Sequence, residues 1–214
     1  EHVIAANEGN AIGLAAGHHL STGGIPLVYM QNSGMGNALN PLLSLVNKEV
    51  YSIPMILLID WRGSPDVDDW AHHKKQGRLT PELLDLMDIP YKILEENETQ
   101  VFDSVKWAAN KSNDINTPVA LIAKRGVFSS SKKNNEYNKN EFSRENAIEE
   151  VIDNFPKNSF FVATTGRATI EIYDLREIKG QTHEKDFLNV GAMGHASSIA
   201  LGIAIAHEDD LVVC

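Results

Sequence analysis

The hydrophobic positions of this chain form short continuous runs that alternate with longer stretches of helical periodicity. The runs are bounded by proline or polar residues and predict buried parallel strands at 26–30, 55–59 and 119–123. Between them, apolar residues recur at helical spacing and predict helices at 8–20, 37–46, 81–87 and 99–110. Strands alternating with helices predict an α/β fold with a parallel sheet.

A polar, low-complexity stretch of Ser, Lys, Asn and Glu over 129–140 interrupts this pattern and predicts a linker over 129–143. Ser143 then resembles a helix cap, although Asn146 stands where a capping box has an acid. Further strands are predicted at 160–163 and 187–190, with helices at 166–176 and 195–206. We therefore expect two doubly wound α/β domains, at 1–128 and 144–214.

Composition and charge narrow the class of protein. The 214 residues carry a formal net charge of -10, which argues against a broad grip on nucleic acid. The single cysteine, Cys214, allows neither an internal disulfide nor a Cys-rich metal cluster, which favours a reducing cytoplasm. No run approaches the roughly 18 to 20 apolar residues of a membrane span, so we expect no membrane association.

Glu8 is the first residue with candidate chemistry, because it is an acid at the start of a helix rich in Ala, Gly and Leu. One interpretation is an acid favoured by the helix dipole. The other is a carboxylate that faces an apolar interface and shares a proton with a heterocycle. The local sequence does not choose between them.

The turn 31–37 follows one predicted strand and precedes a helix. A glycine-containing turn at that position is suited to an anion or a polar substrate, and Asn32 and Ser33 are its candidate ligands. The alternative is a tight turn that simply needs glycine. The Lys and Ser/Thr of a Walker loop and the spacing of a dinucleotide fingerprint are both lacking.

A second glycine turn, 191–194, also lies between a predicted strand and a helix of small residues. Small residues allow a backbone or a cofactor to approach closely. Met193, between Ala192 and Gly194, suggests a hydrophobic ledge under a ligand. Simple helix packing is the alternative for this motif.

Together these three motifs resemble the thiamine-diphosphate decarboxylase and acetolactate synthase superfamily. The stretch 6–11 resembles the entry to its pyrimidine-binding domain, in which a glutamate bonds the aminopyrimidine; the resemblance gives Glu8 that catalytic role. The stretch 32–36 is similar to a Ser-Gly-Pro-Gly turn, with Met35 in place of Pro. The stretch 191–194 resembles the turn of the diphosphate-binding domain that receives the aminopyrimidine from the other side.

Within the superfamily, the chain is most similar to the phosphonopyruvate decarboxylase family, and the sulfopyruvate decarboxylases share several of its stretches. The matching stretches are 30–34 through 40–42, 48–55, 61–63, 73–77, 164–167 and 194–202. The resemblance implies decarboxylation of a small anionic 2-oxo acid with thiamine diphosphate and Mg²⁺, in a homodimer or higher homo-oligomer whose active site lies between subunits.

The same resemblance assigns candidate binding residues. For the cofactor, besides Glu8, they are Thr165, Gly166, Arg167, Gly191, Met193 and Gly194. For the substrate they are Asn32, Ser33, Arg62, His73 and His195, where Arg62 has the alternative of a solvated loop cation and His73 that of plain surface polarity.

One departure leaves other classes open. The superfamily's Gly-Asp-Gly metal motif is not in this sequence, which opens without Met and ends at Cys214 on an apolar run that resembles the start of a strand. We therefore expect an excerpt that lacks the N-terminal part of the first domain, the C-terminal part of the second and all the metal ligands. The remaining alternatives are a non-catalytic fragment or subunit of a thiamine-diphosphate enzyme, and a nucleotide-binding α/β protein.

Overall fold

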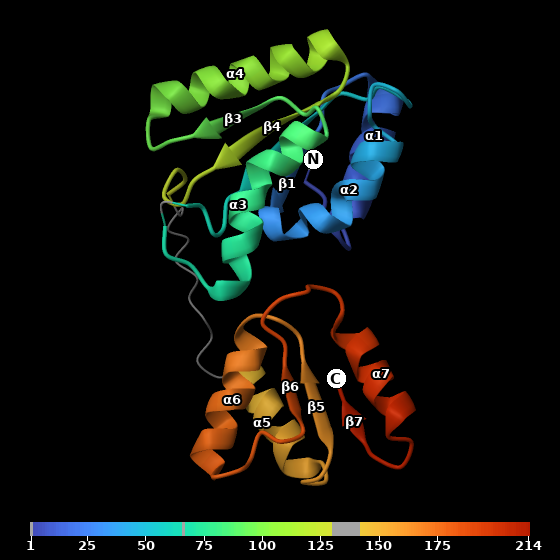
Figure 1. Cartoon of the computed structure of the whole chain (residues 1–214), viewed down its shortest axis with the longest axis vertical. Coiled ribbons are helices and arrows are strands. Elements are labelled where there is room, and N and C mark those ends of the chain that lie inside the picture. The colour runs from blue at the N-terminus through green and yellow to red at the C-terminus, as the bar shows by residue number, and fades with distance from the viewer. Residues whose placement is uncertain (1, 66, 130–141) are drawn as a thin grey trace. The chain divides into compact units, whose positions relative to one another are not determined.

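The computed structural model describes residues 2–65, 67–129 and 142–214, and most of the predicted linker lies outside these ranges. The chain forms two compact units, residues 1–132 and 133–214 (Figure 1). Each unit is described by itself. Both contain parallel sheets flanked by helices, which confirms the predicted α/β class.

Unit 1 is a four-stranded parallel sheet in the order β1-β2-β4-β3. Its elements, in chain order, are α1 (Glu8–Thr22), β1 (Leu27–Gln31), a 3₁₀ turn η1 (Asn32–Gly34), α2 (Met35–Ser44), β2 (Met55–Asp60), α3 (Ala71–Leu86), β3 (Tyr91–Leu94), α4 (Glu98–Ile115) and β4 (Pro118–Ala123).

Helices cover both faces of this sheet because successive side chains of a strand point to opposite faces. Met55, Leu57 and Ile59 of β2 join one core cluster with residues of α1, α2 and α3. Ile56 belongs to a second cluster, with Leu58 packed against it, that contains residues of α4. Figure 1 shows α4 on the side of the sheet away from α1 and α2. Strands β2 and β4 are thus buried on both faces, as expected for parallel strands. Strand β1 is buried on one face only, because Leu27 and Tyr29 are exposed, so the prediction of a fully buried strand at 26–30 was wrong for that face.

The prediction for α3 was wrong at its start, which lies ten residues before Pro81, at Ala71. A proline within a helix leaves the carbonyl four residues earlier without its usual donor. Here that carbonyl belongs to Gly77, and it accepts a 2.8 Å hydrogen bond from the Trp61 indole instead. The helix therefore continues through Pro81. Strand β3, which pairs only with β4, was not predicted at all.

Unit 2 is a three-stranded parallel sheet in the order β6-β5-β7. Its elements are α5 (Arg144–Asn154), β5 (Phe160–Ala163), α6 (Arg167–Lys179), β6 (Asp186–Leu188), α7 (Ala196–Ala206) and β7 (Val212–Val213). Ser143 caps α5 with a capping box in which Asn146 takes the place of the usual acid. The core packs α5 and α6 against β5.

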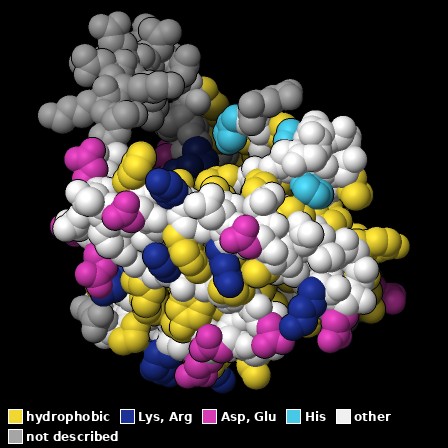
Figure 2. Space-filling view, turned by 90° about the horizontal axis from the view of Figure 1, so that it is seen from above, with side chains coloured by type: hydrophobic (Ala, Val, Ile, Leu, Met, Phe, Trp, Pro, Cys, Tyr) yellow, Lys and Arg dark blue, Asp and Glu magenta, His cyan; other side chains and the backbone are white. Residues whose placement is uncertain are grey.

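Two surface properties bear on possible partners. On the face drawn in Figure 2, Lys and Arg side chains are interspersed with Asp and Glu rather than gathered in one region. Among the described residues, no helix has both the length and the apolar character needed to cross a membrane.

Candidate active site

Glu8 is the first residue of α1, and Asn7 caps the helix by accepting from the backbone N–H of Asn10 at 2.9 Å. The Glu8 carboxylate lies against the turn that follows β1: a Cβ added to Gly34 would lie 2.2 Å from Glu8 Oε1. On its other oxygen, Oε2, it accepts a 2.9 Å hydrogen bond from Asn37 Nδ2. The structure thus brings together two motifs that the sequence predicted separately.

Helices α1 and α2, which carry Glu8 and Asn37, approach each other closely at Gly9 and the Asn37 carbonyl. Pro41 lies inside α2 and leaves the carbonyl of Asn37 without its usual helical donor. A Cβ on Gly9 would lie only 2.8 Å from that carbonyl oxygen. Gly9 therefore permits the close contact between α1 and α2 that sets Glu8 beside Asn37.

Asn32, the residue after β1, is buried and connects three elements. Its Nδ2 donates to the Arg62 carbonyl at 2.8 Å and to Thr80 Oγ1 at 2.9 Å, and its Oδ1 accepts from the Arg62 N–H at 3.1 Å. Ser33 donates to the Gln31 carboxamide. The Asn32 carboxamide fixes the backbone of Arg62, and a direct contact with substrate stays a prediction for both Asn32 and Ser33.

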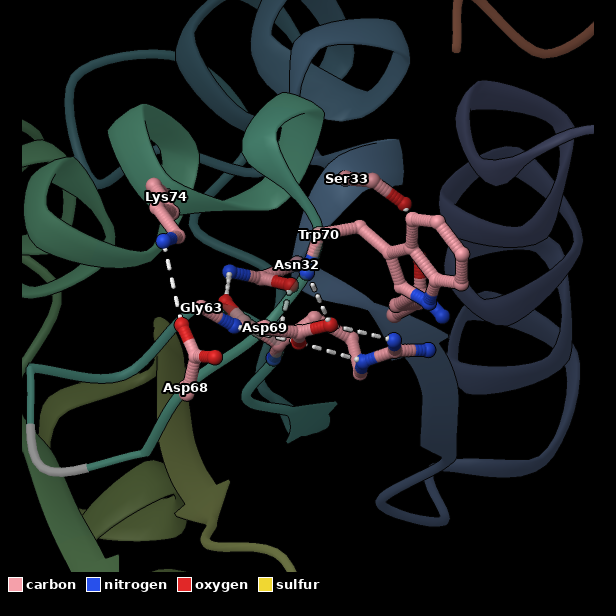
Figure 3. Close-up of polar contacts among 9 residues, drawn as sticks. Asn32, Ser33, Gly63, Asp68, Asp69, Trp70 and Lys74 are labelled. Carbon is pink, nitrogen blue, oxygen red and sulfur yellow. Dashed lines mark hydrogen bonds and ion pairs between the residues drawn. The ribbon is translucent and has the colours of Figure 1, made fainter. Parts of the chain in front are cut away.

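Arg62 follows β2 and forms a forked ion pair with Asp69, Nε to Oδ2 at 2.8 Å and Nη2 to Oδ1 at 2.7 Å. Asp69 also accepts from the backbone N–H of Gly63 and of Trp70 (Figure 3). The hydrogen bond from Arg62 is the largest cause that holds the pKa of Asp69 well below its usual range, and the same bond raises the pKa of Arg62. Arg62 is therefore paired and positioned, unlike a solvated loop cation.

His73, in the first turn of α3, is 8% exposed, so the alternative of plain surface polarity is wrong. Burial lowers the pKa of His73, and the positive charge of Arg62 lowers it further. Its Nδ1 is buried and has no hydrogen-bond partner within the described part of the chain. The backbone around it is tightly packed, since a Cβ on Gly63 would lie 2.1 Å from the His73 carbonyl oxygen.

In unit 2, the turn 164–166 connects β5 to α6. Gly166 has φ of 102°, and the space around a Cβ added there is open to 4 Å. Thr169 Oγ1 lies 2.8 Å from the Thr164 carbonyl and 3.0 Å from the Asn189 carbonyl, so it ties the ends of β5 and β6 together. Thr165 and Arg167 flank Gly166, which places these three predicted cofactor residues in one turn at the carboxyl end of β5.

The turn 191–195 follows β6 and is formed largely by backbone. Ala192 and Gly194 have positive φ, 50° and 81°. Asn189 Oδ1 accepts from the Gly191 N–H at 3.1 Å, and His195 Nδ1 lies 2.8 Å from the Met193 carbonyl. Met193 is 37% exposed, so its side chain is accessible, and its role as a ledge under a ligand stays a prediction.

Sequence reasoning missed Asn37, Asp69 and Thr80. Asn37 could have been found from Pro41, because a proline four residues later marks a position where the helix backbone is altered. Nothing in the sequence separates Asp69 from its neighbour Asp68, which forms an ion pair with Lys74. Among the described residues there is no group of three or more His, Cys, Asp or Glu that could hold a metal ion.

Comparison with known proteins gives the class. Residues 1–89 match the family described as thiamine pyrophosphate enzyme, N-terminal TPP binding domain. Phosphonopyruvate decarboxylases of Streptomyces viridochromogenes and Streptomyces hygroscopicus are each 28% identical over 99% of this chain and 55% of their own length. Sulfopyruvate decarboxylase subunit alpha of Methanococcus maripaludis is 31% identical over 57% of this chain and 70% of its own length.

The chain therefore belongs to the thiamine pyrophosphate enzymes, which confirms the resemblance to that superfamily. Its relatives there are decarboxylases named for phosphonopyruvate and for sulfopyruvate. The chain spans about half the length, 55%, of the two phosphonopyruvate decarboxylases that it matches.

Proposed function

We propose that the whole protein is a thiamine-diphosphate-dependent decarboxylase that converts phosphonopyruvate to phosphonoacetaldehyde and CO₂ in phosphonate biosynthesis. The observation that carries the proposal is the share of this chain over which each relative is similar. The similarity to phosphonopyruvate decarboxylases runs over 99% of the chain and so includes both units. The similarity to the sulfopyruvate decarboxylase alpha subunit runs over 122 residues, which is too few to include both units in full.

In this proposal unit 1 is the pyrimidine-binding domain and unit 2 is the beginning of the diphosphate-binding domain. The family match over 1–89 supports the first assignment. For the second, the support is the pair of glycine turns at the carboxyl ends of β5 and β6, where the space beside Gly166 and Gly194 is open and would let an anion approach the backbone. Their proposed cofactor contacts are Thr165, Gly166, Arg167, Gly191, Met193 and Gly194.

The geometry around Glu8 suits the proposed role in catalysis. Asn37 holds Oε2, and the absent side chain of Gly34 leaves room for the carboxylate beside the turn. With the cofactor bound, Glu8 would share a proton with the ring nitrogen of the aminopyrimidine, which would be acid-base catalysis at that atom. The bound cofactor supplies the electron sink that stabilises the carbanion left by loss of CO₂.

The substrate would meet polar groups rather than a broad positive surface. Asn32, Ser33, Arg62 and His73 lie at or after the carboxyl ends of β1 and β2, and His195 follows β6. Ligands of parallel sheets bind at that edge. The guanidinium of Arg62, whose charge Asp69 balances, offers directed N–H groups to an anion.

Three further parts of the proposal rest on the family resemblance or on composition. The enzyme uses Mg²⁺ with its cofactor, it is a homodimer or higher homo-oligomer with active sites between subunits, and it is cytoplasmic. The relatives named subunit alpha support assembly from more than one chain. The single cysteine supports the location.

The test measures aldehyde and CO₂ release by the complete gene product from phosphonopyruvate, sulfopyruvate and pyruvate, with and without thiamine diphosphate and Mg²⁺. Cofactor-dependent turnover fastest on phosphonopyruvate is the expected result. A preference for sulfopyruvate would change the substrate assignment but leave the proposed thiamine-dependent decarboxylation in place. Absence of thiamine-dependent turnover on all three would refute the proposal.

Glu8→Gln has a matched control in Glu98→Gln. Glu98 begins α4 after the capping Asn97, just as Glu8 begins α1 after Asn7. Both changes remove the same favourable helix-dipole interaction, worth about 0.3–1 kcal/mol. We expect Glu8→Gln to lower kcat by about 100-fold or more and Glu98→Gln to leave it unchanged. Equal effects would mean that Glu8 is only a helix-terminal acid.

A further inference from the structure

Asp69 accepts more hydrogen bonds than an ordinary loop acid. Its two oxygens receive Arg62 Nε, Arg62 Nη2, the Gly63 N–H at 2.9 Å and the Trp70 N–H at 2.8 Å. Its side chain is only 10% exposed. The Arg62 guanidinium therefore has a fixed plane, since a fork of two hydrogen bonds to one carboxylate allows little rotation.

Arg62 is fixed at both ends yet remains accessible. Asn32 holds its backbone N–H and carbonyl, and Asp69 holds Nε and Nη2. Its side chain is still 35% exposed, and within the described residues Nη1 has no partner. One edge of the guanidinium is thus left without a partner among the described residues, on the loop that follows the carboxyl end of β2.

Unit 2 contains a second forked pair that shows what a purely structural one looks like. Arg176 donates to both oxygens of Asp186 at 2.9 Å, and its Nη1 donates to Gln181 at 2.7 Å. The guanidinium also lies over the Phe161 ring, and its side chain is 7% exposed. Every nitrogen of Arg176 is used internally, whereas Arg62 retains an outward edge.

We propose that Asp69 is a positioning residue, which orients the outer edge of Arg62 to bind the tetrahedral oxyanion tail of the substrate. This inference rests on the proposed function for the identity of the substrate. Because the Arg62 charge is balanced by Asp69, the pair recognises the anion by directed hydrogen bonds more than by net charge. Phosphonate and sulfonate share this chemistry, and the methyl group of pyruvate lacks it.

The experiment compares Asp69→Asn with Asp68→Asn in the complete, cofactor-loaded protein. Asp68 is the adjacent acid, its side chain is 95% exposed, and it forms an ion pair with Lys74 on the surface (Figure 3). We expect Asp69→Asn to raise KM for phosphonopyruvate about tenfold or more, as for loss of a charge-assisted hydrogen bond, with kcat/KM for pyruvate unchanged. Asp68→Asn should change neither.

The sign of this effect is diagnostic. Removal of a negative charge beside an anion site should by itself tighten binding, so loss of the Asp69 charge alone would lower KM, whereas the charge of the exposed Asp68 is screened by water and its removal should change little. Weaker binding in Asp69→Asn alone therefore reports lost positioning of Arg62. Equal losses of kcat/KM on phosphonopyruvate and pyruvate would mean a structural role only, and would overturn the inference.

Arg62→Lys keeps the charge but cannot form the fork, so it serves as a second variant if Asp69→Asn folds poorly. It should raise KM for phosphonopyruvate to a similar extent. The double variant should be no worse than either single change, since both remove the same interaction. Additive losses would mean that the two residues act separately, against the inference.

Direct binding separates this inference from the proposed function. Calorimetry with the complete protein would use phosphonoacetate, sulfoacetate and acetate, none of which has a 2-oxo group to decarboxylate. Wild type and Asp68→Asn should bind one or both tetrahedral anions more tightly than acetate, and Asp69→Asn should bind them about tenfold more weakly. Retained binding without any decarboxylation would refute the function alone. Binding unaltered by Asp69→Asn would refute the inference alone.

Discussion

In each unit an asparagine directly follows a strand of the sheet, and the two asparagines form different hydrogen bonds. Asn32 follows the end of β1, and Asn189 follows the end of β6; both are buried. Asn32 bonds to a loop and a helix far along the chain, through Arg62 and Thr80. Among the described residues, the side chain of Asn189 bonds only to Gly191, two residues away. At the carboxyl ends of the strands in unit 1, side chains hydrogen-bond to distant segments and hold them together. At the carboxyl end of β6 in unit 2, the Asn189 side chain bonds only within its own turn, which is formed mainly by backbone.

The difference fits the two proposed roles. A site that selects among small anions needs side chains held at fixed positions, because selectivity depends on groups that cannot rearrange. A site that receives a diphosphate or an aminopyrimidine ring can be made of backbone amides and carbonyls, provided that side chains do not obstruct it. Gly166 and Gly194 meet this condition, since a Cβ at either would have no neighbour within 4 Å.

The largest expected difference in stability between the two units comes from replacing a helical glycine by alanine. A Cβ on Gly77 in α3 would lie 1.8 Å from the Gly63 carbonyl oxygen, whereas the Gly202 position in α7 is open. Gly77→Ala should destabilise unit 1 by about 3–5 kcal/mol. Gly202→Ala should stabilise α7 by up to about 1 kcal/mol. Calorimetric unfolding of the chain measures both, and similar effects would contradict the contrast.

A smaller effect comes from truncating the two asparagines themselves. Asn32→Ala leaves the partly buried N–H of Arg62 without its acceptor and removes three hydrogen bonds, at a cost of about 2–4 kcal/mol. Asn189→Ala removes one side-chain bond, at about 0.5–1.5 kcal/mol. Urea unfolding gives the two differences. If the Asn189 variant lost as much as the Asn32 variant, stabilisation of the strand ends by side chains would not be peculiar to unit 1.

The fold was largely predictable because apolar runs and helical periodicity are local signals. The strands at 55–59, 119–123 and 160–163 lie within those of the structure or coincide with them. The first turns of α3 were missed because 72–76 is polar and Pro81 resembles a helix start. The carbonyl that Pro81 leaves unpaired finds its donor in Trp61, sixteen residues earlier, and no local pattern reports that.

The sequence predicted which residues belong to the candidate site, but not which residues form hydrogen bonds and ion pairs with them. The sequence pointed to Glu8, Arg62 and His73, and in the structure the partly exposed Arg62 is near enough to the buried His73 for its charge to lower the pKa of that histidine. It could not show that Asp69 and not Asp68 orders the guanidinium, because two adjacent aspartates differ only in where the folded loop directs them. Their cofactor and substrate roles stay predictions for the experiments above.

The smallest of the three stability effects concerns His73 and the pH. Burial is the largest cause of its lowered pKa, and Arg62 and His72 add to it while Asp69 and Asp60 oppose it. When the pKa of a histidine is lower in the folded protein than in the unfolded chain, the unfolded chain binds the proton at a higher pH, and protonation favours unfolding. Stability should therefore fall as the pH drops below the ordinary value of 6.5 towards the lowered one.

His73→Gln removes this proton linkage, so the free energy of unfolding of the variant should fall less between pH 8 and pH 5, roughly the range over which histidine titrates. The same change at the neighbouring, only partly buried His72 is the control and should keep most of the wild-type dependence. Urea unfolding at several pH values gives the profiles. Parallel profiles for wild type and His73→Gln would mean that the imidazole accepts its proton as readily in the folded state. The unpartnered Nδ1 beside Arg62 would then be accessible to water, and the contrast between a closed edge in unit 1 and an accessible one in unit 2 would weaken.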